Sequence, residues 1–370
     1  VCADEPAGVC ADKENAVFAS KTAIESFAMF KVGLLRICPF PRSSRRGDWQ
    51  PERPAVPALT QTEDDRSAIC HRRSPSSLPM MKIPRDALLE RLSRQAELSS
   101  APREVRLRHL PFRLVLPRRL DAAGLAWPVT ATTFFGRPMH VHLPDLVGVK
   151  LYQYGFFEEG LTRALIEKLR PGDTFVDIGA HVGYFTLLAS LLVGADGHVV
   201  SFEPTPRTRT ELSANTAGLA NVRVVPLAAW DATERLTLQD FGWRQSSFNS
   251  VVGARVNGNA RFESIEVEAV AVDDWLADHG IVPAFIKIDA ESAEQRVLRG
   301  LRRTIEQHHP ILSLEIGDYN LPGVPRSAEL IQSIVEQGYD AFEYRDGTFV
   351  KHRLADGYAY DNLIFMPSRT

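Results

Sequence analysis

Cysteine is scarce in this sequence, because all four cysteines lie within the first 70 of its 370 residues. No two of them have the CxxC spacing of a zinc site. The rest of the chain therefore has no disulfide, no cysteine-ligated zinc and no thiol nucleophile. These absences favour a reducing, cytoplasmic setting for the main body of the protein.

The sequence also lacks a long apolar run and an excess of positive charge. No uninterrupted apolar stretch reaches the ~18 residues that a transmembrane helix needs. Lysine and arginine number 43 against 46 acidic residues, a formal net charge of −3, so we expect no nucleic-acid partner. Residues 103–119 are locally basic, and we interpret them as a solvated strand or loop. A surface for an acidic glycan or a membrane is the alternative.

The first 84 residues differ from the rest in composition. They contain every cysteine, several polar clusters and no lasting apolar periodicity, and we predict that they are mostly disordered. The sequence begins with Val1, whereas Met80 and Met81 come just before the first clear helical pattern. One hypothesis is that residues 1–79 derive from a wrongly assigned start. Mass spectrometry of the native N-terminus would test it.

Residues 85–165 are predicted to form a segment that packs on the core. An amphipathic helix should begin near Asp86 as its N-cap, and a hairpin should span residues 132–145 with its turn at Gly136. A second helix is expected over residues 156–169.

Strands and helices alternate from residue 166 to the end, which we assign as the main domain. This alternation predicts an α/β fold, a Rossmann-like, doubly wound and mostly parallel sheet. We expect the last two strands to form an antiparallel pair at the edge of the sheet. The predicted strands are 174–178, 198–203, 222–228, 285–289, 310–316, 341–344, 348–352 and 362–366, and the helices are 183–194, 206–217, 292–307 and 326–337.

The stretch DTFVDIGAHVGYFT leads from the first of these strands into a helix. Asp177 ends the strand, and Gly179 and Gly183 would let the backbone approach a ligand. The helix start would offer free N–H groups. His181 and Tyr184 lie in the same turn, and all five residues are candidate cofactor contacts.

Glu203 follows Gly183 by twenty residues and ends the second strand, where an acid can accept hydrogen bonds from both ribose hydroxyls of an adenosine. The G-x-G-x-x-G pattern of dinucleotide enzymes is absent. Asp177 would repel a pyrophosphate but suits a cationic ligand, which favours S-adenosylmethionine. An NAD-dependent oxidoreductase remains the alternative. Asp231 follows the third strand as a candidate contact to the adenine amine, or as a simple turn residue.

Five segments in order resemble the FkbM family of S-adenosylmethionine-dependent methyltransferases. They are VDIGAHVGYFTLLAS, SFEPTPRTRTELSANTAGL, FIKIDAESAEQRVLRGL, HPILSLEIGD and NLIFMP, within residues 145–368. The resemblance implies methyl transfer to a hydroxyl of a carbohydrate, glycolipid or similar natural product. A non-catalytic member that only binds the cofactor stays open.

Two residues depart from the family pattern. His181 replaces the usual Asn, which could alter cofactor contacts, and Ser292 replaces the usual Gly. Because serine is a good capping residue at a helix start, we expect the second change to be harmless.

Methyl transfer to a hydroxyl needs alignment of the reacting atoms and a group that accepts the proton. Asp289 ends the fourth strand and is the candidate base or acceptor anchor. Lys287 lies on the same side of that strand and would pair with it, and Glu291 could share its role. Glu315 ends the fifth strand, and a metal ion held by Asp289 and Glu315 is conceivable. Without a dense carboxylate cluster, we expect no metal.

Overall fold

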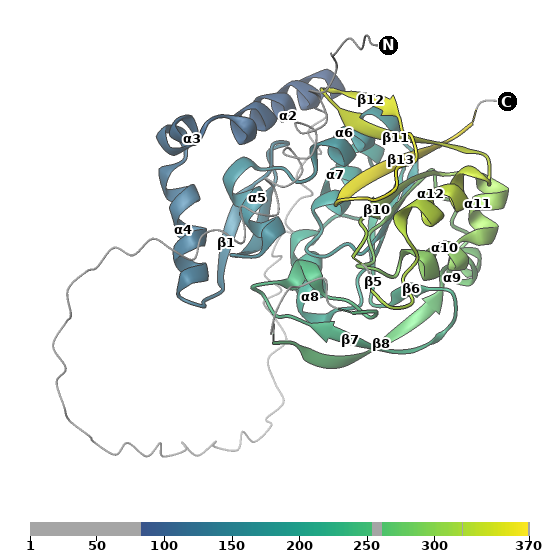
Figure 1. Ribbon diagram of the computed structural model, residues 1–370. Coiled ribbons are helices and arrows are strands. Elements are labelled where there is room, and N and C mark those ends of the chain that lie inside the picture. Colours follow the sequence, from purple (N-terminus) through teal and green to yellow (C-terminus); the bar gives the residue numbers. More distant parts are fainter. Residues whose placement is uncertain (1–82, 254–260, 320, 369–370) are drawn as a thin grey trace, which may run out of the picture. The chain divides into compact units, whose positions relative to one another are not determined.

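The computed structural model describes residues 83–253, 261–319 and 321–368 (Figure 1). The predictions for residues 1–79, and nearly all of those for 1–84, therefore lie outside the described residues. Within them, an eight-stranded sheet has the order β12-β11-β13-β10-β9-β3-β4-β5. Its strands are β3 (Thr174–Ile178), β4 (His198–Phe202), β5 (Val222–Val225), β9 (Phe285–Ile288), β10 (Ile311–Ile316), β11 (Tyr339–Arg345), β12 (Thr348–Lys351) and β13 (Asp361–Pro367).

The five strands from β10 to β5 are parallel, which confirms the predicted Rossmann-like sheet. Alternate strand residues enter different apolar clusters: Phe175 belongs to one, and Val176 and Ile178 to the other. Both faces of the sheet are therefore covered, as a parallel sheet requires. The helices that follow the strands are α7 (Tyr184–Val193), α8 (Pro206–Asn215), α9 (Val272–Asp278), α10 (Glu294–Gly300), α11 (Arg302–His308) and α12 (Ser327–Val335).

The edge of the sheet differs from our expectation. β12 and β13 do not pair with each other, because β11 lies between them and is antiparallel to both. β11 and β12 form a hairpin whose two turn residues, Asp346 and Gly347, have φ values of 49° and 85°. An Asp-Gly pair with positive φ is typical of the two-residue turn that joins adjacent strands.

The segment before the sheet is more helical than predicted. Its elements are α2 (Arg85–Ser100), α3 (Arg103–His109), α4 (Pro111–Ala122), β1 (Trp127–Thr132), β2 (Pro138–Leu143), α5 (Leu146–Tyr154) and α6 (Glu159–Lys168). The predicted hairpin with its turn at Gly136 is confirmed, but its first strand begins at Trp127 rather than at residue 132. The interpretation of residues 103–119 as a strand or loop was wrong, since they form α3 and most of α4.

Two further details of this segment correct the sequence analysis. Asp86 is not an N-cap, because α2 begins at Arg85 with Pro84 before it. Leu88, Leu92 and Ala96 are buried and join the apolar cluster that also contains Phe175. The segment therefore packs on the core, while its boundary with the main domain at residue 165 stays a prediction.

A second, three-stranded sheet was not predicted. It has the order β6-β8-β7 and consists of β6 (Ala228–Trp230), β7 (Glu234–Asp240) and β8 (Glu263–Ala271). The single strand expected over 222–228 is instead divided between β5 and the start of β6, which lie in different sheets. A short helix, η1 (Ser246–Phe248), follows β7. Among the described residues, no helix is long and apolar enough to cross a membrane.

Candidate cofactor and acceptor site

Asp177 is fully buried at the end of β3, and its carboxylate anchors the loop between β3 and α7. Its Oδ2 accepts a hydrogen bond of 2.7 Å from the Thr186 hydroxyl, at the start of α7. Its Oδ1 lies 3.4 Å from Lys287 Nζ. Because Lys287 balances its charge, the predicted repulsion of a pyrophosphate is weaker than the sequence alone suggested.

The glycines of the loop serve packing between elements. Gly179 has a φ of 73°, and a Cβ there would lie 1.8 Å from the Asp289 carbonyl oxygen. Gly183 has a φ of 92°, and a Cβ there would lie 2.5 Å from Leu212 Cδ1 in α8. Any other residue would push the loop away from β9 and α8. Gly179 therefore brings the loop against the end of β9, beside Asp289.

Glu203 is held at the end of β4 by three donors. Its carboxylate accepts hydrogen bonds of 2.8 Å from the His181 amide, 2.9 Å from the Thr205 amide and 2.8 Å from the Thr208 hydroxyl. A carboxylate has about four acceptor positions, so this one keeps capacity for a ligand. The structure brings Glu203 and the β3–α7 loop together, as the predicted ribose contact requires.

His181 joins this loop to η1. Its φ of 50° lies in the left-handed region, which Asn and His tolerate better than most residues. Its Nε2 lies 2.9 Å from the Ser246 hydroxyl, and that hydroxyl donates to Asp145 Oδ2 at 3.2 Å. His181 thus preserves the backbone shape that Asn would give, and it adds a side-chain contact to a neighbouring loop.

Lys287 is buried among acidic groups at the end of β9. Its Nζ lies 3.1 Å from Asp289 Oδ2 and donates to the Gly179 carbonyl at 3.1 Å. Burial lowers the pKa of Lys287, but the negative charges of Asp289, Asp177 and Glu158 raise it by more. The net shift of the pKa is therefore upward. Lys287 therefore stays protonated, and the predicted pairing with Asp289 is present.

Glu158 belongs to the same group of charges and was not predicted. It comes just before α6, and its carboxylate accepts a hydrogen bond from the Tyr360 hydroxyl. Burial and the charge of Asp289 raise the pKa of Glu158 to about 7. No motif marks this residue in the sequence. Its φ of 44° and its place near the carboxyl end of the sheet appear only in the fold.

Three carboxylates gather where β9 and β10 end. One oxygen from each of Asp289, Glu291 and Glu315 lies within 4.8 Å of the others. From the sequence, only Asp289 and Glu315 were expected to lie together, and no dense cluster was predicted. These oxygens could coordinate a divalent cation such as Mg²⁺, although acidic groups also gather without one. They also place Glu291 beside Asp289, as proposed.

Two predicted cofactor contacts also interact with other parts of the protein. The Tyr184 side chain is buried, with its hydroxyl 3.1 Å from that of Thr162, so it faces the core. Asp231 pairs with Arg296 of α10 at 2.9 Å and lines a surface pocket together with residues of α9 and α10. These interactions favour the simple turn interpretation of Asp231.

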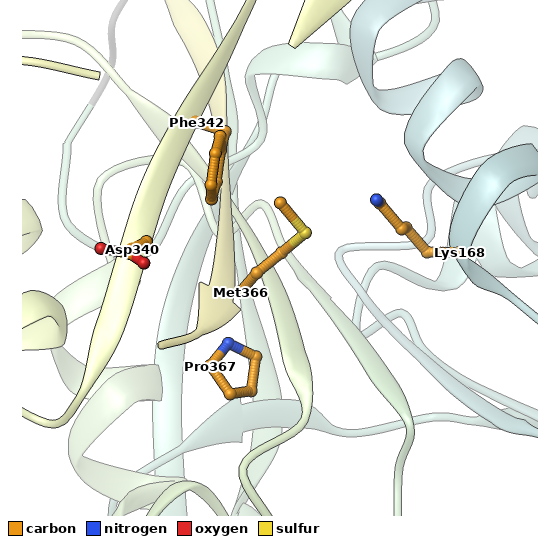
Figure 2. Close-up of a pocket in the computed structure, with 5 residues that line it drawn as sticks. All are labelled: Lys168, Asp340, Phe342, Met366 and Pro367. Carbon is orange, nitrogen blue, oxygen red and sulfur yellow. The ribbon is translucent and has the colours of Figure 1, made fainter. Parts of the chain in front are cut away.

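The cavity in Figure 2 is separate from this site. It has a volume of about 340 Å³ and is lined by Lys168, Asp340, Phe342, Met366 and Pro367. β13 runs antiparallel to β10, and Phe365 is paired with Leu312 near the start of β10. The cavity therefore lies at the amino ends of the parallel strands, opposite Asp289 and Glu315.

The parallel sheet, and the β3–α7 loop with Asp177 and Glu203 beside it, are typical of a Rossmann-like protein that binds an adenosine-containing cofactor. The methyltransferase FkbM domain model matches residues 177–341. The chain is 31% identical over 180 residues to the 31-O-demethyl-FK506 methyltransferase FkbM of Streptomyces tacrolimicus, covering 41% of this chain and 67% of that protein. The chain belongs to the FkbM family of S-adenosylmethionine-dependent methyltransferases, whose cofactor is S-adenosyl-L-methionine.

Solved structures give more distant likenesses. The methyltransferase FkbM of Methylobacillus flagellatus KT is 19% identical with a TM-score of 0.34, covering 55% of this chain and half of that one. Fibrillarin of Aeropyrum pernix, solved with natively bound S-adenosyl-L-methionine, is 13% identical with a TM-score of 0.32, covering 54% of this chain and 68% of that one.

Proposed function

We propose that this protein transfers the methyl group of S-adenosylmethionine to a hydroxyl of a carbohydrate, glycolipid or similar natural product. The observation that carries the proposal is the close approach of Gly179 to the backbone carbonyl of Asp289, which places the cofactor loop beside a residue whose carboxylate is partly exposed. The Streptomyces relative, whose name describes a 31-O-demethyl-FK506 methyltransferase, supports an oxygen acceptor.

In this proposal Asp289 accepts the proton of the acceptor hydroxyl, and Lys287 fixes the orientation of its carboxylate. Bound S-adenosylmethionine supplies an electrophilic methyl group on a sulfonium. Glu203 holds the ribose hydroxyls, and the short β3–α7 loop sets the distance between cofactor and acceptor.

The test separates cofactor binding from turnover. We expect Asp289→Asn to retain affinity for S-adenosylhomocysteine in calorimetry and to lose about 10²-fold or more in turnover. Glu203→Gln should instead weaken binding about tenfold, because it removes charge-assisted hydrogen bonds. Asp340→Asn, at the opposite end of the sheet, is the control and should change neither quantity.

Turnover is measured as transfer of labelled methyl from S-adenosylmethionine to a panel of glycosides, glycolipids and a hydroxyl-bearing macrolide. Unchanged turnover in Asp289→Asn would remove Asp289 from the mechanism. Cofactor binding without transfer to any acceptor would favour a non-catalytic member. Tight binding of NADH in a fluorescence titration, with no binding of S-adenosylhomocysteine, would favour the oxidoreductase.

A further inference from the structure

The outward face of α4 carries an unusual apolar stripe. Phe112, Val115 and Leu116 are 83%, 43% and 36% exposed, and their spacing places them on one side of the helix. Leu114 and Pro117, on the other side, are buried. A surface helix normally buries its apolar face and exposes polar residues, whereas α4 is apolar on both sides.

Exposed apolar side chains are concentrated around this helix. Of the fourteen large hydrophobic residues that are exposed in the described parts of the chain, six lie between residues 105 and 127. They include Trp127, which is 60% exposed at the start of β1, just after α4. Tryptophan is the residue that most favours the boundary between water and lipid.

The same region is strongly basic. Residues 103–122 contain six arginines and two acids, in a chain whose formal net charge is −3. Arg119 follows Phe112 by seven positions and therefore lies on the same face as the stripe. Arg103 and Arg108 are exposed on α3, which contacts α4. The apolar stripe thus lies in a positively charged region of the chain.

We propose that α3, α4 and the start of β1 bind the surface of an anionic lipid bilayer. The apolar side chains would enter the boundary between headgroups and acyl chains, while the arginines contact lipid phosphates. A second copy of this chain fits less well, because a symmetric contact would bring two arginine clusters together. The proposal does not depend on methyl transfer, although a protein at a membrane would meet lipid-linked acceptors directly.

The experiment is co-sedimentation of the full chain with phosphatidylcholine vesicles that contain or lack phosphatidylglycerol. We expect binding to the anionic vesicles alone. The double substitution Phe112→Ser and Leu116→Ser should weaken binding about tenfold or more, since it removes apolar insertion. The pair Arg108→Gln and Arg119→Gln should weaken it as well and reduce its dependence on salt.

Val282→Ser with Val335→Ser is the matched control, because these valines are 55% and 43% exposed outside the basic region. This control should sediment like the unchanged protein. Failure of the unchanged chain to bind anionic vesicles, or equal binding to both vesicle types, would overturn the proposal. A dimer in size-exclusion chromatography that the Phe112 and Leu116 substitutions dissociate would overturn it in favour of a second copy.

Discussion

Ser292 has a backbone conformation that suits glycine, with a φ of 80° in a buried position. The expectation that it is harmless as a helix cap was wrong about its position, because the N-cap of α10 is Ala293. The left-handed conformation costs a non-glycine residue about 1–2 kcal/mol. This explains physically why a glycine would be preferred there.

Ser292→Gly should therefore stabilise the protein by about 1 kcal/mol. This value allows for the greater conformational entropy that glycine gives the unfolded chain, which offsets part of the relieved strain. Thermal unfolding should show a midpoint about 2 °C higher. Ser333→Gly, inside α12, is the control and should lower the midpoint, because glycine destabilises a helix interior. A lower midpoint in Ser292→Gly would show that the serine makes contacts worth more than the strain.

His181→Asn tests the contact between the cofactor loop and η1. Asparagine tolerates the same positive φ, and the backbone amide would still donate to Glu203. We therefore expect affinity for S-adenosylhomocysteine to change less than about threefold while stability falls by about 1 kcal/mol, the usual value of one hydrogen bond. Ser246→Ala should lose more, because it also removes the hydrogen bond to Asp145, and the double variant should lose little more than Ser246→Ala alone, since the contact between His181 and Ser246 is shared. Additive losses would contradict the coupling.

At the scale of elements, a buried aspartate fixes α11. Asp273 accepts hydrogen bonds of 2.8 Å from the Arg303 amide and 2.9 Å from the Thr304 amide, which begin that helix. Asp273→Ala should lower the free energy of unfolding by about 2–3 kcal/mol, because it leaves helix-start amides without an acceptor. Its neighbour Asp274 makes an exposed ion pair with Arg303, so Asp274→Ala should cost less than about 0.5 kcal/mol. Urea denaturation of the two variants compares them directly, and equal losses would refute the argument.

The elements show which structure the sequence could reveal. Four of the five parallel strands were predicted closely, because each is a short apolar run that ends in a turn signal, whereas β5 ends earlier than predicted. The β11–β12 hairpin had a readable signal in Asp346-Gly347, which the prediction did not use. β6, β7 and β8 could not be assembled from local patterns, because β6 and β8 pair across about 40 residues of chain. The helix α4 was not predicted, because apolar residues on both of its sides leave no clear helical period in the sequence.

The site shows a similar limit at the scale of the whole molecule. Asp177, Glu203, Lys287 and Asp289 stand at strand ends, so topology alone brings them together, as predicted. Glu158 reaches the same charges from the start of α6, through long-range contacts that no local spacing encodes. Its altered pKa arises from burial and from Asp289, which are both properties of the assembled fold.

Glu158 should make the stability of the whole protein depend on pH. Its pKa rises from 4.5 to about 7 on folding, so its favourable contribution is complete below about pH 4.5 and is lost as the pH rises through 7. Between pH 5 and 8 the unchanged protein should lose about 2 kcal/mol relative to Glu158→Gln, whose amide does not titrate. This is less than the full shift implies, because Glu158 as a residue is only half-buried. Urea denaturation at both pH values measures the difference. Glu336→Gln, at an exposed acid, should follow the unchanged protein, whereas parallel pH curves for Glu158→Gln and the unchanged protein would refute the raised pKa.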